Sequence, residues 1–110
     1  MKTIHKYVLD KSIMFNHIAM PIGNIILSIQ NQNDEITIWA EVDTEAKMEI
    51  VEFVSIYTGT NISSIERIRE NYIRSYIGTI QIKSLVWHVF KLIKYEPVTK
   101  DTSVMELIYV

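Results

Sequence analysis

The sequence predicts a mainly β protein, with about seven strands in a mostly antiparallel sheet or half-barrel and one short inserted helix. Three observations support this class. Polar and apolar residues alternate over most of the chain, and the apolar ones are largely β-branched or aromatic. Turns rich in Asn, Asp and Gly separate these segments at hairpin length, which favours antiparallel pairing. One segment, residues 62–75, instead repeats its apolar residues every three or four positions.

The first half of the chain contains the clearest strand patterns. Strands are expected at residues 3–9, 13–20, 25–30, 35–42 and 47–58. In the fourth of these, Ile36 and Ile38 point to one side while Trp39 points to the other. That period of two is typical of an antiparallel sheet with one solvated face.

The helix is expected at residues 62–75, where Ile65, Ile68 and Tyr72 share one face. Ser63 and Glu66 have the spacing of a capping box, in which each side chain bonds a free backbone amide at the start of a helix. The pattern therefore predicts a helix of about three turns between two strands.

Two further strands are expected at residues 76–83 and 85–95. The second is apolar on both faces, so we expect it in the centre of a sheet. Residues 1–95 are interpreted as a single domain. Residues 96–110 are interpreted as a C-terminal extension that adds an edge strand or docks on a neighbouring subunit, the alternative being a frayed terminus.

Composition limits the classes of partner. The chain has 110 residues, of which 48% are hydrophobic, and a net charge of −2. So much apolar material on one small domain indicates burial between subunits, and hence a homo-oligomer, although a dense Ile-rich core is the alternative. The balanced charge argues against duplex nucleic acid as a partner. There is no cysteine, which excludes disulfides, thiolate metal sites and a cysteine nucleophile.

The N-terminus has no signal-peptide pattern, and no apolar run is long enough to span a membrane. We therefore expect a cytoplasmic protein with no membrane partner.

Several short blocks carry a family resemblance. They read Lys-Thr-Ile-His-Lys-Tyr at residues 2–7, Ile-Ile-Leu-Ser-Ile at 25–29, Ile-Trp-Ala-Glu-Val-Asp at 38–43, Tyr-Ile-Gly-Thr-Ile-Gln at 76–81 and Leu-Val-Trp-His-Val-Phe at 85–90. Together they resemble a family of small, functionally uncharacterised domains that are common in phage and prophage genomes.

The resemblance covers about residues 1–92, and this chain differs by a longer segment at residues 60–75 and an added tail after Tyr95. It implies a phage-associated cytoplasmic protein. It transfers no catalytic residue, because the family has none assigned.

The arginines are the first candidates for ligand binding. All three, Arg67, Arg69 and Arg74, fall in the predicted helix. Arg67 and Arg74 are seven positions apart and would share one helical face, while Arg69 would point elsewhere. Because a guanidinium is a planar fork of donors, the pair suits a phosphate group. The alternative is a solvated helix in which both arginines lie near Glu70.

A turn precedes the predicted helix at Thr58, Gly59 and Thr60. It supplies two hydroxyl groups next to the free amides of the helix start, where anions bind readily. With the arginines, this turn predicts a pocket for a small phosphate-bearing ligand. The tetrapeptide Tyr-Thr-Gly-Thr at 57–60 also has a partial echo, Tyr-Ile-Gly-Thr, at 76–79.

Trp39 is the remaining candidate for binding, because it lies on the polar side of its strand. An exposed tryptophan stacks on a base or anchors a protein partner, whereas a covered one is part of a core or an interface. His5, His17 and His88 are too scattered to predict a metal or catalytic site. His88 lies in an apolar strand and is interpreted as a hydrogen-bonded core residue.

The sequence thus favours a non-enzymatic, homo-oligomeric protein of phage type that sequesters a small anionic, nucleotide-like ligand such as an immune signal, and so evades host defence. No catalytic residue, metal or cofactor is expected. The second hypothesis is a protein–protein interaction module that binds a host or virion component through a sheet edge or the Trp39 face. The third is a small hydrolase whose site the sequence does not reveal.

Overall fold

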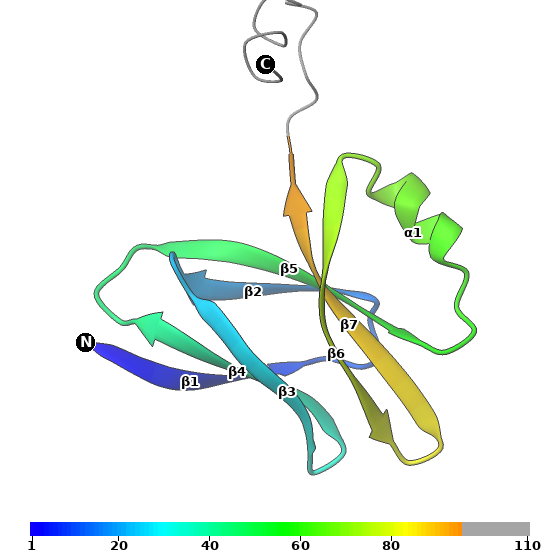
Figure 1. Ribbon diagram of the computed structural model, residues 1–110, viewed down its shortest axis with the longest axis horizontal. Helices are drawn as coiled ribbons and strands as arrows, with labels where there is room; N and C mark the ends of the chain where they lie inside the picture. Colours follow the sequence, from blue (N-terminus) through cyan, green and yellow to red (C-terminus); the bar gives the residue numbers. More distant parts are fainter. Residues whose placement is uncertain (96–110) are drawn as a thin grey trace, which may run out of the picture.

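The computed structural model describes residues 1–95, and Figure 1 shows their arrangement. These residues form seven strands and one short helix, so the predicted mainly β class is confirmed. In chain order the elements are β1 (Lys2–Leu9), β2 (Phe15–Pro21), β3 (Ile25–Gln32), β4 (Glu35–Asp43), β5 (Met48–Tyr57), α1 (Ile62–Ile68), β6 (Tyr72–Ile82) and β7 (Leu85–Lys94).

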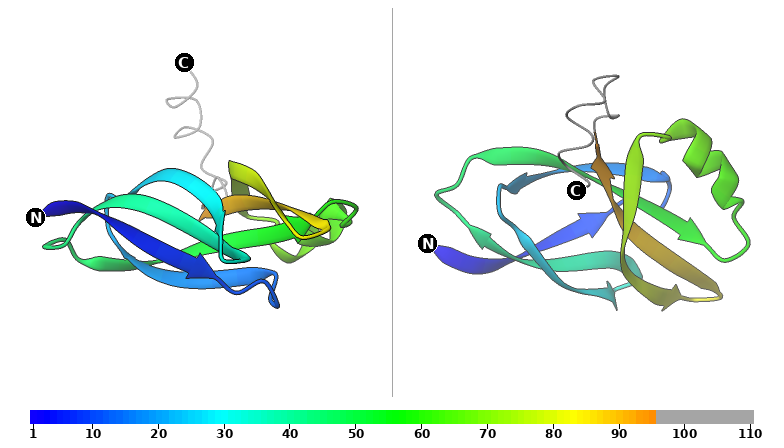
Figure 2. Two further views of the ribbon diagram at one scale, coloured as in Figure 1. Left: turned by 90° about the horizontal axis from the view of Figure 1, so that it is seen from below. Right: turned by 45° about the horizontal axis from the view of Figure 1, so that its top comes forward.

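The strands form two antiparallel sheets. The smaller sheet has three strands in the order β1-β4-β3, and the larger has four in the order β2-β5-β7-β6. β7 pairs on both sides, which agrees with the expectation that the strand with two apolar faces is central in its sheet. In the views of Figures 1 and 2, α1 lies at the opposite end of the molecule from the N-terminus.

The main core lies between the two sheets. Its buried side chains include Ile36 and Ile38 from β4 and Phe53, Trp87 and Val89 from the larger sheet. Burial of such side chains contributes roughly 1.5–3 kcal/mol each, so this layer is the principal source of stability.

A second apolar cluster lies on the other face of the larger sheet, beneath α1. It contains Val54 and Ile56 of β5, Leu92 of β7 and Ile65 of α1. Because neighbouring residues of a strand point to opposite faces, β5 has Phe53 in the main core and Val54 under the helix. The helix is therefore attached to the outer face of the four-stranded sheet.

The two sheets meet where β3 packs on β6. The Asn31 side chain donates a hydrogen bond to the carbonyl of Gln81 over 2.9 Å. A Cβ at Gly78 would overlap Cγ2 of Ile29, so this close approach requires a glycine. The contact between β3 and β6 is made by side chains rather than by ladder pairing, which leaves two separate sheets.

The helix is shorter than the predicted range of residues 62–75. α1 ends at Ile68, and β6 already begins at Tyr72. Tyr72 and Arg74 pair with Lys94 and Leu92 in the β6–β7 ladder, so strand pairing with an apolar neighbour outweighed the weak helical period. The prediction that Arg67 and Arg74 share a helical face is therefore wrong, because Arg74 lies on a strand.

The predicted capping box is also wrong. The N-cap of α1 is Asn61, whose side-chain oxygen accepts a hydrogen bond from the Ser63 amide over 3.0 Å. Ser64 Oγ donates to the Asn61 carbonyl, and Glu66 contacts Arg74 instead of the helix start. Asparagine is among the preferred N-cap residues. The helix is therefore capped as expected, but by a residue two positions before the predicted Ser63.

The predicted C-terminal extension, residues 96–110, lies outside the described residues. The described helix, α1, has only 7 residues, and nothing in residues 1–95 has the length and apolar character of a membrane-spanning helix.

Candidate functional site

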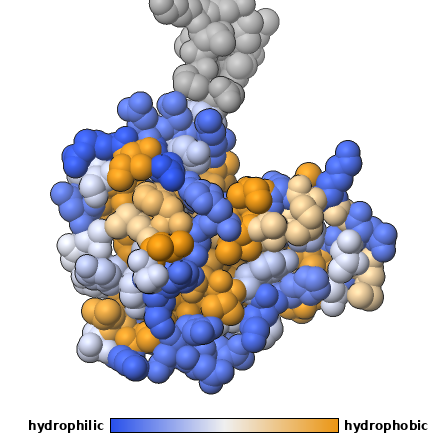
Figure 3. Space-filling model, turned by 180° about the vertical axis from the view of Figure 1, so that it is seen from behind, coloured by the Kyte–Doolittle hydropathy of each residue, from blue (hydrophilic) through white to orange (hydrophobic). Residues whose placement is uncertain are grey.

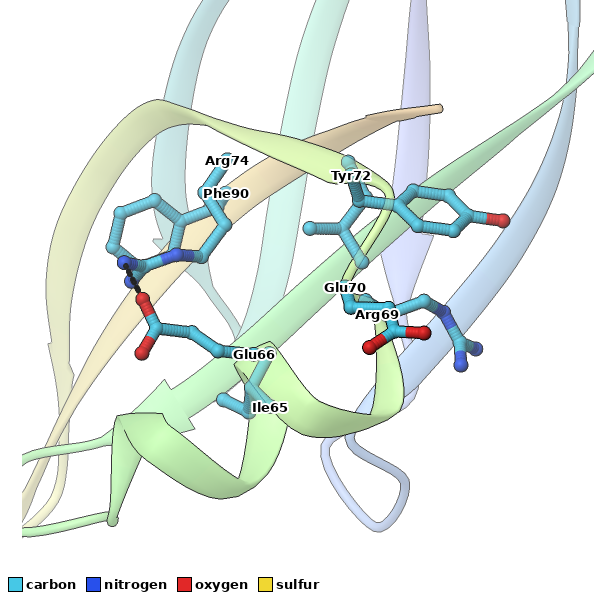
Figure 4. Close-up of a pocket in the computed structure, with 8 residues that line it drawn as sticks. Ile65, Glu66, Arg69, Glu70, Tyr72, Arg74 and Phe90 are labelled. Atoms are coloured by element: carbon cyan, nitrogen blue, oxygen red, sulfur yellow. Dashed lines mark hydrogen bonds and ion pairs between the residues drawn. The ribbon is translucent and has the colours of Figure 1, made fainter. Parts of the chain in front are cut away.

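A hollow lies between α1 and the outer face of β6 and β7, as Figure 4 shows. Its volume is about 370 Å³. The helix contributes one wall and the two strands contribute the floor. The lining includes Ile65, Glu66, Arg69, Tyr72, Arg74 and Phe90. The position of α1 on the sheet therefore creates the cavity that contains one of the arginines selected from the sequence.

Arg74, unlike the other arginine that lines the hollow, forms an ion pair that solvent can reach. Its Nη2 donates to Glu66 Oε2 over 3.3 Å, and its Cζ lies 5.5 Å from the centre of the Phe90 ring. The Arg74 and Glu66 side chains are 29% and 59% exposed, respectively. An ion pair this accessible contributes only about 0–1 kcal/mol, so an incoming anion can replace Glu66 at small cost.

Arg69, by contrast, is committed to a buried carboxylate. Its Nε and Nη2 donate to the two oxygens of Glu52 over 2.8 and 2.9 Å, and its guanidinium lies 4.2 Å from the centre of the Phe15 ring. His17 Nε2 approaches Glu52 Oε2 at 2.5 Å. The hydrogen bonds from Arg69, aided by its charge and by His17, hold the pKa of Glu52 below its ordinary value despite burial.

The Arg69–Glu52 pair therefore holds the end of α1 to β5. The same pair raises the pKa of Arg69. In Figure 4 the Arg69 guanidinium turns away from the side of the hollow where Arg74 meets Glu66. Arg69 is thus bound to the buried Glu52, whereas Arg74 lines the hollow and pairs with the exposed Glu66.

Beyond Phe90, on the same face of the sheet, four side chains are joined by hydrogen bonds into a chain. His88 Nε2 contacts Thr58 Oγ1 at 2.8 Å, and His88 Nδ1 contacts Thr79 Oγ1 at 3.0 Å. The Thr79 hydroxyl in turn contacts the Tyr76 hydroxyl at 2.5 Å. The Tyr76 ring lies 5.6 Å from the Phe90 ring, centre to centre, so the chain adjoins the hollow.

A β-bulge brings Tyr76 and Thr79 onto the same face. Residues three apart on a regular strand point to opposite sides of a sheet. Here the register shifts between Tyr76 and Gly78, which leaves Ile77 as the extra residue. On the other side of His88, Thr58 is held near β7 by the bond from its amide to the Val86 carbonyl. Gly59, at φ +100°, then turns the chain toward α1.

The structure brings together some of the residues predicted from the sequence. Arg74 lines the hollow, and Thr58 belongs to the hydrogen-bonded chain on the same face of the sheet. Gly59 and Thr60 form the adjoining turn, in which the Thr60 hydroxyl donates to the Tyr57 carbonyl. Arg67 is exposed on α1 and does not line the hollow.

Trp39 lies elsewhere, on the outer face of the three-stranded sheet. It is opposite Lys6 and Ser28 in the two ladders, and the Lys6 ammonium lies 6.0 Å from its ring centre. Since α1 packs on the other sheet, Trp39 and the hollow are separate features.

Sequence reasoning missed Tyr76, Thr79 and Phe90 and gave His88 only a core role. His88 is hydrogen-bonded as expected, but it is half-buried on an outer face. The one available signal was the echo at residues 76–79. That echo is not a structural repeat, because it aligns Thr79 with Thr60, whereas Thr79 and Thr58 are the two partners of His88.

The polar groups of this face centre on the His88 imidazole. Both ring nitrogens of His88 contact threonine hydroxyls, rather than the carboxylate that orients the histidine of a catalytic triad. Across residues 1–95, no three histidine or carboxylate side chains converge as metal ligands would. The face carries the Arg74 guanidinium, the aromatic rings of Tyr72, Tyr76 and Phe90, and a set of hydroxyl groups.

These features define a two-sheet β domain with a candidate ligand-binding face under its single described helix. The chain belongs to the family described as a domain of unknown function (DUF7352), whose model matches residues 1–100. The expectation of a family without an assigned function is thus confirmed, and the match extends beyond the predicted limit near residue 92. No curated protein and no solved structure matches the chain.

Proposed function

We propose that this protein is a non-enzymatic accessory protein of phage type that sequesters a small anionic, nucleotide-like ligand, such as an immune signal, as a homo-oligomer in the host cytoplasm. The observation that supports this proposal is the position of Arg74, which lines a hollow with an aromatic floor and, within residues 1–95, pairs with an exposed carboxylate. The phage association rests on the family resemblance of the sequence.

The hollow has the size and chemistry for such a ligand. Its volume of about 370 Å³ falls within the usual range of small-molecule sites, which is roughly 300–1,000 Å³. Arg74 offers a fork of donors to phosphate oxygens, and Phe90 provides apolar surface beneath it. Because Glu66 and Glu70 also line the hollow, the ligand must take the place of Glu66 at Arg74 rather than add to a cationic pocket.

The test compares Arg74→Ala with Arg67→Ala. Both remove one arginine, but Arg67 lies outside the hollow and serves as the matched control. Calorimetric titration with nucleoside monophosphates and cyclic dinucleotides should show binding by the wild type and a loss of roughly tenfold to a hundredfold for Arg74→Ala, as expected for one charge-assisted contact. Arg67→Ala should bind as the wild type does. Equal affinities of all three proteins would refute the proposal.

A protein–protein interaction module is the second candidate, and the exposure around Trp39 favours it. The face that carries Trp39 also presents Ile4, Val8 and Ile25, each well exposed. If a host or virion protein is the ligand, Trp39→Ala should abolish its capture without changing nucleotide affinity, and Arg74→Ala should have no effect on that capture.

A further inference from the structure

We infer that the hydrogen-bonded chain of Thr58, His88, Thr79 and Tyr76 recognises the polar edge of a nucleobase, so that the ligand is a nucleotide rather than any small phosphate. This inference rests on the proposed function, because it requires a phosphate at Arg74. It assigns a second, uncharged part of the ligand to residues that neither the sequence patterns nor the family match had identified together.

The distances along β7 suit a nucleotide. Arg74 is opposite Leu92 in the ladder, and its guanidinium reaches over Phe90. Phe90 and Leu92 are two and four positions from His88, which corresponds to roughly 7 and 13 Å on an extended strand. A phosphate bound to Arg74 is therefore separated from His88 by the length that a ribose and a base occupy. Inorganic phosphate cannot contact both places.

The chain also has the hydrogen-bonding character of a base-reading element. A neutral imidazole has one donor nitrogen and one acceptor nitrogen, and hydroxyl groups rotate to match either. If Thr58 donates to His88, the remaining bonds run toward Tyr76, whose hydroxyl then donates outward. If the bonds run in the opposite direction, Thr58 donates outward and Tyr76 accepts. The two ends thus always present opposite roles, and the Tyr76 end, which adjoins Phe90, can take the role that matches one donor or acceptor of a base edge.

Tyr76 supplies the stacking surface. Its side chain is 60% exposed, and it lies between the Phe90 ring and the Thr79 hydroxyl. Aromatic rings beside cationic groups are the usual platform for single bases. The bulge at Ile77 is the feature that places Tyr76 and Thr79 on this face, and bulges of this kind are common next to binding sites, where they redirect side chains.

The experiment measures how much the base contributes to affinity. Adenosine, guanosine, cytidine and uridine 5′-monophosphates are compared with ribose 5-phosphate, which lacks the base, by calorimetric titration of the full chain. The variants are Thr79→Val, which removes the hydroxyl at nearly constant shape, and Thr79→Ser, which keeps it. Melting temperatures establish that each variant is folded.

At least one nucleotide should bind the wild type roughly tenfold more tightly than ribose 5-phosphate, as expected for one base contact. Thr79→Val should abolish this preference and leave the affinity for ribose 5-phosphate unchanged, and Thr79→Ser should restore the preference. Arg74→Ala should weaken both kinds of ligand.

Three results overturn the inference, and the first two separate it from the proposed function. If ribose 5-phosphate binds as tightly as every nucleotide and still depends on Arg74, the phosphate site stands and the base-reading role is refuted. The same holds if Thr79→Val keeps the nucleotide preference. If none of the five compounds binds the wild type, both proposals are wrong for nucleotides of this size.

Discussion

Glu52 is a charged residue in the interior of the larger sheet, where it is only 8% exposed. It accepts hydrogen bonds from Arg69 at the end of α1 and contacts His17 on β2. Removing one partner of a buried ion pair leaves the other charge uncompensated, and this is more costly than the pair itself was stabilising. We therefore expect Glu52→Gln to lower the free energy of unfolding by roughly 2 kcal/mol at neutral pH.

The same residue predicts a pH dependence. Since the folded-state pKa of Glu52 is lowered, its carboxylate stabilises the fold above its ordinary pKa and this contribution is lost as the pH falls through the lower value. Urea denaturation at neutral pH and in the acid range should show that the wild type loses more stability on acidification than Glu52→Gln does. Glu66→Gln, at an exposed pair, is the matched control and should differ little from the wild type at either pH.

Single residues were also where sequence reasoning was least reliable. The arginines were identified as a group, but their roles depend on partners that are distant in the chain. Arg69 was set aside because of its helical direction, yet it pairs with Glu52, 17 positions earlier. His88 acquired two partners from β6 and the turn after β5. No local pattern reveals such contacts, because they depend on which strands become neighbours.

At the scale of elements, the cap of α1 offers a direct test of the observed helix start. Asn61 accepts from the Ser63 amide, whereas the Ser63 side chain has no capping role. Loss of an N-cap typically costs about 1 kcal/mol. Asn61→Ala should therefore destabilise the protein by about that amount, whereas Ser63→Ala should leave its stability within a few tenths of a kcal/mol of the wild type. Thermal denaturation of the two variants distinguishes the observed cap from the capping box that the sequence indicated.

The elements themselves were largely predictable. Each expected strand exists, with ends displaced by a few residues, because alternation of apolar and polar side chains is a local property that pairing preserves. The helix was placed correctly at its start and extended too far at its end. Residues 72–76 fit both the helical period and the alternation of a strand. They form a strand because they pair with β7. The bulge at Ile77 and the packing of Gly78 on Ile29 likewise follow from the meeting of β6 with β3 and β7.

At the scale of the whole molecule, many apolar side chains of residues 1–95 remain exposed at the surface. Figure 3 shows them between hydrophilic residues on the side opposite to the view of Figure 1. On the outer face of the three-stranded sheet, Ile4 is opposite Glu41 and Lys6 is opposite Trp39. This face carries apolar groups and both signs of charge, so two copies related by a two-fold axis can match a lysine of one with a glutamate of the other.

We therefore predict that the chain self-associates through this face. Ile4 and Leu85 are 57% and 46% exposed, respectively, but Leu85 lies at the start of β7 on the other sheet. Sedimentation velocity at micromolar concentrations should show an oligomer for the wild type and for Leu85→Ser, and a shift toward monomer for Ile4→Ser. The substitution removes apolar contact area that only the assembly buries, so the monomer itself should melt at nearly the same temperature. A monomeric wild type would show that the high apolar content serves the core alone, and dissociation caused by Leu85→Ser but not by Ile4→Ser would place the interface on the larger sheet.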